Sequence, residues 1–384
     1  MRFFKLLTLC VSLLAVLPAY ANDGVYYTRG NHLVPLQETD ISIRREVLTI
    51  SLMDNGYARV DVQYEFWNPG SDVKRVVMGF EADPPYNDNY KFYPDGVHPN
   101  IRDFSVEMNG RMLAYRNAAC LRDTLPLIMI DTTKRYYVFD NNWIYDVSND
   151  DGNEPFDIDA GFPFTYVYYF DAEFKPGLNR VHHTYSYRMS YIAGIPYQVD
   201  YKLTPASRWA GGKIDDFTLV VRADNTAKHF MMSTLPFPEA EFKVVEGMGK
   251  IRKKNTFYGS GCEFSLRNGA VQLHLNDFSP QEELCIFSIY VYSNNNQYGY
   301  SYDRSTDMYL WYDMNNNNNN SIDKAFLKRI ARNLPYANRG HVFSDPKLKE
   351  YFESLWWYMP DPDYKDSTDD FTDVDYKYIN AKFE

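Results

Sequence analysis

The stretch VLTISLMDNGYARVDVQYEF, residues 47–66, decides the fold of this chain. Val62, Tyr64 and Phe66 recur at every second position, which is the period of a strand with one buried face. Asn55-Gly56 lies between this run and the apolar run before it, and Asn-Gly between two such runs is a strong hairpin signal. The stretch therefore predicts an antiparallel β-hairpin.

The same pattern recurs as far as residue 293, where long helical periodicity is absent. About a dozen expected strands favour an antiparallel β-sandwich body over 22–293, built either as one large sandwich or as two in tandem. The expected units are a hairpin over 104–115 around Asn109-Gly110, a hairpin over 166–191 with a loop at 176–179, a central strand over 217–221, and a meander over 264–292.

Composition narrows the class of protein. The chain has 384 residues, 17% of them aromatic, and a formal net charge of −11. Aromatic-rich chains bury enough apolar area to offset chain entropy, which excludes disorder throughout. Acidic balance without a basic run argues against nucleic acid as a partner, because phosphate binding needs clustered lysine and arginine.

The N-terminus has the features of a secretory signal peptide. Arg2 and Lys5 precede a short apolar run, and Ala19-Tyr20-Ala21 provides a small-x-small cleavage site. We therefore expect residues 1–21 to be removed, leaving a net charge of −13, and the protein to be exported to the periplasm or the extracellular space. We expect no transmembrane segment in the mature chain, because no other stretch reaches the length of about 18 uncharged apolar residues.

Three cysteines follow the signal: Cys120, Cys262 and Cys285. An odd number does not indicate a disulfide framework. A Cys262–Cys285 bridge stays open, and the alternative is that Cys285, within Leu284–Phe287, is a buried thiol in a strand.

The character of the chain changes after residue 293. Residues 294–320 are rich in Asn and Tyr, end in six asparagines, and are typical of a linker. Apolar residues then recur with a helical period over 327–334, and we expect Pro335 to end that helix. Asp345-Pro346 predicts the start of a second helix that closes at Trp356–Tyr358. Residues 361–384 carry eight acidic and three basic side chains and predict a frayed acidic tail, delimited as 367–384.

The segment ARNLPYANRGHVF, residues 331–343, followed by Asp-Pro, Tyr-Phe and Trp-Tyr pairs, resembles the YARHG domain, a short module of bacterial extracytoplasmic proteins. The resemblance covers about 321–366. Asn338, Arg339 and His341 depart from the usual motif. The family carries no assigned chemistry, so the resemblance implies an envelope or extracellular accessory module.

A module of this size needs large aromatic side chains for a core. The residues expected to be structural anchors are Tyr336, Gly340, Phe343, Tyr351, Phe352 and Trp357, with Gly340 supplying a positive φ. Arg332 and Arg339 are expected to cap carbonyls or to pair with Asp345 or Glu350. The alternative is that the module faces a glycan or peptide, and the binding candidates are then Trp356, Arg332 and Arg339, with Tyr298 and Tyr300 in the linker.

The body also resembles a family of exported bacterial proteins without known activity. The similar segments are NDG at 22–24, LVPL at 33–36, YEFWNPG at 64–70, GFE at 79–81 and WAGGKI at 209–214.

Motifs for catalysis or metal binding are missing from the sequence, which has no His-Glu-x-x-His, Cys-x-x-Cys or Gly-x-Ser-x-Gly. Adjacent His182 and His183 should point to opposite faces of a strand and cannot share a metal. We expect no metal, cofactor or catalytic residue. The leading hypothesis is a non-catalytic, exported cell-envelope protein whose β body binds a ligand or partner, either cell-wall glycan or envelope proteins. The alternative is an envelope hydrolase acting on glycan or peptide.

Overall fold

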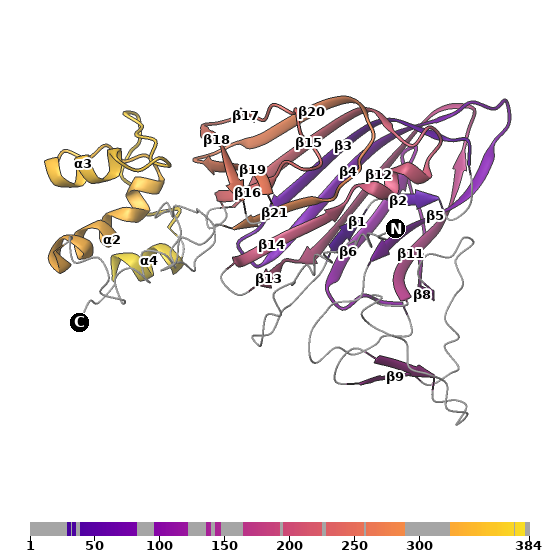
Figure 1. The fold of residues 1–384 in the computed structure, drawn as a ribbon, viewed down its shortest axis with the longest axis horizontal. Helices are drawn as coiled ribbons and strands as arrows, with labels where there is room; N and C mark the ends of the chain where they lie inside the picture. The colour runs from indigo at the N-terminus through magenta and orange to yellow at the C-terminus, as the bar shows by residue number, and fades with distance from the viewer. Residues whose placement is uncertain are drawn as a thin grey trace, which may run out of the picture.

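A computed structural model describes residues 29–31, 33–35, 39–82, 96–121, 136–139, 143–146, 164–192, 195–224, 228–256, 259–288, 323–371 and 373–380. The expected signal peptide, the linker over 294–320, Tyr298 and Tyr300 lie outside these residues. The described part is mainly β, as the sequence predicts (Figure 1). The body contains one short 3-10 helix among its described residues, η2 (Thr204–Arg208), and the α-helices of the described part all follow residue 322. Within it, no helix is long and apolar enough to cross a membrane.

The sheet with the most strands among the described residues of the body has eight. Its strands, in spatial order, are β17 (Lys243–Val245), β20 (Ala270–Phe278), β15 (Ile214–Ala223), β3 (Ser42–Leu52), β4 (Tyr57–Asn68), β12 (Gly177–Arg188), β6 (Ile101–Met108) and β7 (Arg111–Met112). Strand β15 lies between β3 and β20, which confirms the central strand predicted over 217–221. It runs parallel to β3, although most other pairs are antiparallel.

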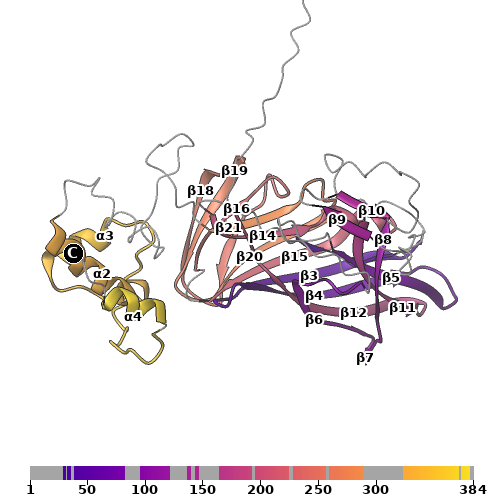
Figure 2. The same cartoon turned by 90° about the horizontal axis from the view of Figure 1, so that it is seen from below.

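Further sheets complete the body. The seven-stranded sheet contains β1 (Arg29–Asn31), β14 (Ile195–Lys202), β21 (Leu284–Ser288), β16 (His229–Ser233), β19 (Gly259–Leu266) and β18 (Gly249–Thr256), with β13 (Ser190–Ile192) beside β14. The four-stranded sheet contains β2 (Leu33–Pro35), β5 (Lys74–Ala82), β11 (Phe164–Phe174) and β8 (Arg116–Leu121), and β9 (Tyr136–Phe139) pairs with β10 (Trp143–Asp146). In Figure 2, β14, β16 and β21 lie on one side of the layer formed by β3, β4, β6 and β12.

One apolar core joins these sheets. It contains Phe80 of the four-stranded sheet, Val60 and Phe217 of the eight-stranded sheet, and Phe264 of the seven-stranded sheet. The body therefore has a single continuous core, as one large sandwich requires.

Two of the predicted hairpins are confirmed and one is wrong. Strands β3 and β4 pair through the expected turn, with Gly56 at φ 78°, and β6 pairs with β7 through Asn109 and Gly110. The hairpin predicted over 166–191 is wrong, because β11 pairs with β5 and β8 whereas β12 pairs with β4 and β6. The turn at 176–177 therefore connects two different sheets, and the apolar faces of both strands reach the shared core.

The predicted meander over 264–292 is also wrong. Strands β19 and β21 belong to the seven-stranded sheet, whereas β20 between them belongs to the eight-stranded sheet. Each strand has the predicted apolar pattern, but closing a sandwich places consecutive strands on opposite sides of the core.

The C-terminal module contains α2 (Lys324–Asn338), α3 (Pro346–Glu353) and α4 (Asp373–Ile379). Helix α2 continues through Pro335, contrary to prediction, because Leu334 and Ala337 on its last turns are buried in the module's core. Helix α3 ends at Glu353, before the predicted Trp356–Tyr358, and the Ser354 hydroxyl donates to the carbonyl of Tyr351. The predicted frayed tail is wrong over α4, which packs on α2 and buries Tyr378.

Candidate functional site: the β18–β19 hairpin and the module beside it

The last two strands of the seven-stranded sheet, β18 and β19, form a hairpin with different surroundings on its two faces. Within the described residues β18 pairs only with β19, so it is an edge strand. Its sequence, GKIRKKNT, carries four basic residues, and charged side chains on an edge strand discourage pairing with other copies of the chain.

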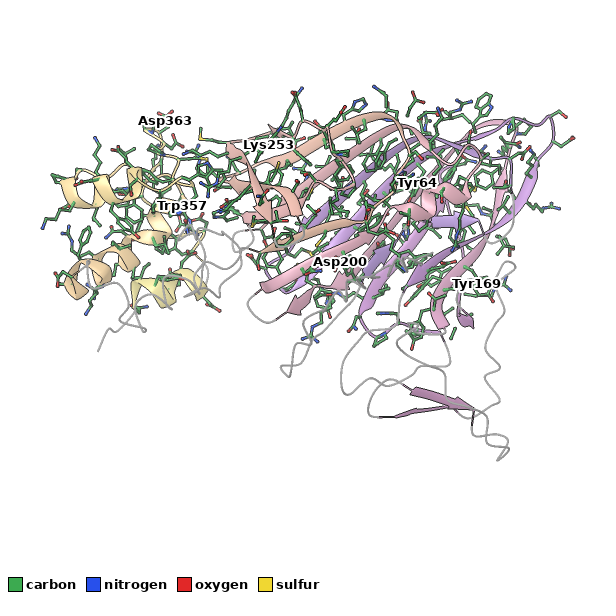
Figure 3. The ribbon with its side chains drawn as sticks, in the orientation of Figure 1. Tyr64, Tyr169, Asp200, Lys253, Trp357 and Asp363 are labelled. Atoms are coloured by element: carbon green, nitrogen blue, oxygen red, sulfur yellow. The ribbon has the colours of Figure 1, made fainter. Side chains whose placement is uncertain are left out.

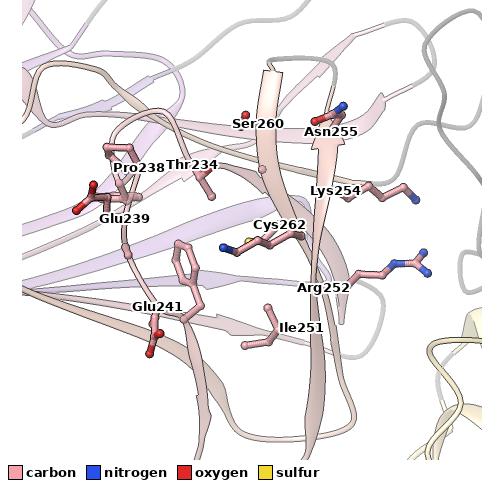
Figure 4. A pocket seen from close by; sticks show the side chains of 15 residues that line it. Thr234, Pro238, Glu239, Glu241, Ile251, Arg252, Lys254, Asn255, Ser260 and Cys262 are labelled. Atoms are coloured by element: carbon pink, nitrogen blue, oxygen red, sulfur yellow. The ribbon is translucent and has the colours of Figure 1, made fainter.

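A groove of about 920 Å³ lies along one face of this hairpin. Phe237, Phe242 and Ile251 supply apolar lining, and Lys253 and Glu241 supply charge. Figure 4 shows Glu239 and Glu241 on one wall and Ile251 on the facing strand, with Arg252 and Lys254 pointing away. A volume of this size fits a ligand as large as a short peptide.

Gly261 lines the groove at a position where the packing requires glycine. A Cβ atom at this position would lie 2.2 Å from Thr256 Cγ2 and 2.6 Å from the carbonyl oxygen of Met232, so only glycine fits. Its neighbour Cys262 also lines the groove, and burial raises the pKa of the Cys262 thiol. The thiol is therefore protonated at neutral pH and acts as a packing group rather than as a nucleophile.

Lys250, Arg252 and Lys254 of β18, together with Arg267 beyond β19, form what we call the basic face of the hairpin. Beneath it lies Glu263, whose side chain is fully buried. Glu263 Oε2 accepts from Arg252 Nε at 2.8 Å and from Lys254 Nζ at 2.9 Å. Its Oε1 lies 2.8 Å from Nε2 of His229, which is on β16. Burial alone would raise the pKa of Glu263, but His229 and Lys254 lower it to about 2.

The helical module lies against the basic face. The Lys250 ammonium donates to the carbonyls of Trp356 and Tyr358, both at 2.8 Å, and Arg267 forms an ion pair with Asp361 at 3.1 Å. The indole of Trp356 lies 4.2 Å from the Arg252 guanidinium and 5.6 Å from the His229 ring. Figure 3 shows Trp357 inside the module and Lys253 at the end of the body nearest to it.

The structure places the expected module anchors as follows. Phe343, Phe352 and Trp357 are buried in the module's core, and Tyr351 packs against it half-buried. Gly340 has φ 92°, the conformation expected for it, at the turn between α2 and α3. Tyr336 is half-buried, and its ring lies 5.1 Å from that of Phe371.

The structure does not bring the predicted binding residues of the module together. Trp356 faces the body, whereas Arg332 is exposed on α2. Arg339 caps the Pro335 carbonyl at 3.0 Å, as expected. Its ion pairs, however, are with Asp370 and Asp375, and Arg329 makes the pair expected with Asp345. The spacing of residues along the sequence did not indicate which arginine pairs with which carboxylate. Asp370 and Asp375, the partners of Arg339, belong to a segment that was predicted to be frayed.

Arg339 joins α4 to α2, and its loss should release α4. Its guanidinium is almost buried and makes two bonds to Asp375, at 2.8 and 3.2 Å. Replacement by methionine should lower the free energy of unfolding of the module by about 2 kcal/mol, because a nearly buried carboxylate loses its partner. Hydrogen exchange over 373–379 measures this loss. Equal protection in Arg339→Met and in the exposed control Arg332→Met would contradict it.

A second depression, of about 770 Å³, lies on the outward face of the eight-stranded sheet. Arg180 there forms an ion pair with Glu65 at 3.1 Å, and His182 lies 3.1 Å from Asp61. His183, the next residue, is fully buried in the core, so the two histidines point to opposite faces as predicted. Cys262 and Cys285 are both buried thiols, and no disulfide joins them. The described residues contain no group of three or more side chains placed to hold a metal ion.

Comparison with known families identifies both ends of the chain. Residues 307–381 match the YARHG domain, and residues 21–124 match a domain of unknown function, DUF4424. Both sequence resemblances are confirmed. The YARHG match extends past the predicted boundary at 366 and includes α4. A comparison with curated proteins finds no match.

Two solved structures show distant similarity to this chain. A candidate nutrient binding protein of Legionella pneumophila has 22% identity and a TM-score of 0.47, with 94% of this chain and 99% of that chain covered. An M1 zinc metallopeptidase of Deinococcus radiodurans has 9% identity and a TM-score of 0.26, with 66% of this chain and 43% of that chain covered. The present chain thus spans less than half of the peptidase. Scores at this level do not transfer an activity.

Proposed function

We propose that this YARHG-domain protein is an exported, non-catalytic binding protein of the cell envelope, and that its β body holds an extended peptide of an envelope partner in the groove beside β18. The observation that carries this proposal is an edge strand with a groove of apolar and charged side chains along it. An extended peptide can add to such an edge through main-chain hydrogen bonds, while alternate side chains enter the groove.

The lining indicates which peptides fit. Phe237, Phe242 and Ile251 accept apolar side chains, and Lys253 attracts a carboxylate. Glu239 and Glu241 on the other wall attract basic side chains. A peptide whose apolar residues alternate with both acidic and basic residues satisfies these requirements. Export is supported by the N-terminal signal pattern and by the YARHG module.

The test measures binding of a synthetic decapeptide, in which valine alternates with glutamate and lysine, to the full mature chain. We expect Ile251→Glu to weaken binding at least about tenfold, because a carboxylate then stands among the apolar side chains that accept the valines. The matched control is Val47→Glu in the depression on the eight-stranded sheet. Equal affinity of wild type and Ile251→Glu would exclude the groove as the site. Retention on purified cell-wall sacculi without peptide binding would favour glycan as the ligand.

A further inference from the structure

The contact between the module and the body is polar and joins two separate cores. Among the described residues, the core of the body contains no residue of the module, and the core of the module, around Leu334 and Phe352, contains no residue of the body. Interfaces within one chain that lack a shared apolar core behave like transient protein–protein contacts. The module can therefore remain folded when it leaves the body.

One short segment of the module supplies the contacts to the basic face. Trp356 stacks on Arg252, the carbonyls of Trp356 and Tyr358 accept from Lys250, and Asp361 pairs with Arg267. An aromatic ring, main-chain carbonyls and a carboxylate are the groups of a polypeptide ligand. The basic face thus already recognises a peptide, which here belongs to the same chain.

This occupant gives Lys250 two neutral carbonyls rather than a carboxylate among the described residues. Burial lowers the pKa of Lys250, because the charged ammonium loses contact with water there. Asp361, on Arg267, is the carboxylate that the segment supplies to the basic face. A more acidic segment would pair with the face more completely.

We propose that Trp356–Asp361 is a reversible latch on the basic face, and that an acidic polypeptide segment of a partner displaces it. Displacement releases the module from the body. It exposes both Trp356 and the basic face on which Trp356 packs. The latch lies on the opposite side of the hairpin from the groove of the proposed function, so either proposal can fail alone.

Poly-L-glutamate is the probe for the basic face of the full mature chain. Trp356→Ala should bind it about tenfold more tightly than wild type, because a latch closed about nine-tenths of the time reduces the apparent affinity by that factor. Tyr376→Ala, which removes an exposed aromatic residue elsewhere on the module, should bind like wild type. Adding Arg252→Glu to Trp356→Ala should abolish the gain.

Small-angle scattering provides an independent readout. The radius of gyration should increase in Trp356→Ala, in Lys250→Met, and in wild type saturated with poly-L-glutamate, but not in Tyr376→Ala. Lys250→Met weakens the latch from the side of the body, so the test does not depend on the folding of one variant. Equal affinity of wild type and Trp356→Ala, or an unchanged radius of gyration, would overturn the latch. Displacement by polyphosphate but not by poly-L-glutamate would overturn the assignment to a polypeptide partner.

Discussion

Replacing Glu263 by glutamine lowers the free energy of unfolding of the body by about 3 kcal/mol at pH 7. The figure follows from the pKa of Glu263, which is about 2 in the folded protein against 4.5 ordinarily, at 1.36 kcal/mol for each pKa unit. The amide keeps the shape of the side chain but removes the charge that His229, Arg252 and Lys254 share. The charged groups of Arg252 and Lys254 then lie close together over a neutral group.

The same residue sets a pH dependence whose sign follows from linkage. The folded pKa lies below the unfolded one, so the stabilisation is complete above about pH 4.5 and is lost as the pH falls towards 2. Urea unfolding of wild type from pH 6 to pH 2.5 should show this loss, and Glu263→Gln should show a flatter profile. The matched control is Glu65→Gln, which removes a pair with a largely exposed arginine and should cost less than about 1 kcal/mol. Parallel pH profiles for wild type and Glu263→Gln would show that this carboxylate does not stabilise the fold.

Replacing Trp209 by alanine should destabilise the body by about 4 kcal/mol. Trp209 is 2% exposed, and its ring lies 4.4 Å from that of Phe66 on β4 and 6.2 Å from that of Phe174 on β11. It therefore joins the eight-stranded and four-stranded sheets, and alanine leaves a cavity between them.

Urea unfolding monitored by far-ultraviolet circular dichroism measures this loss. Trp209→Phe keeps most of the apolar volume and should cost about half as much or less. Trp67→Ala is the control, because this indole is 38% exposed on the outward face of β4 and should cost less than about 1 kcal/mol. A loss in Trp209→Ala no larger than in Trp67→Ala would mean that the two sheets are joined by other contacts.

The candidate site was only partly predictable. The strands that form the β18–β19 hairpin lie in the predicted β body, and the C-terminal aromatics were recognised as anchors of a small module. The groove was missed, because its two walls, 234–242 and 251–262, meet only when the sandwich closes. The cluster at Glu263 was missed for the same reason. His229 lies 34 positions before Glu263, and alternation in β16 and β19 identifies their strands but not their contact.

The sequence by itself determined the elements. Alternation at period two located β4, and a nearly continuous β-prone run located β15. Asn-Gly placed the turns after β3 and β6, and helical spacing located α2 and α3. These signals are local, because a strand or helix shows its buried face in its own residues.

Only the tertiary structure decided how these elements combine. Alternation shows that β11 and β12 each have an apolar face, but not that they enter different sheets, because both arrangements bury the same side chains. Helix α4 is held in place by the ion pair between Arg339 and Asp375. Trp356 packs against the body through Arg252 and Lys250, which lie more than 100 residues earlier in the chain. Such contacts between residues far apart in the sequence form only when the core closes. The periodicity of residues within one strand or helix does not predict them.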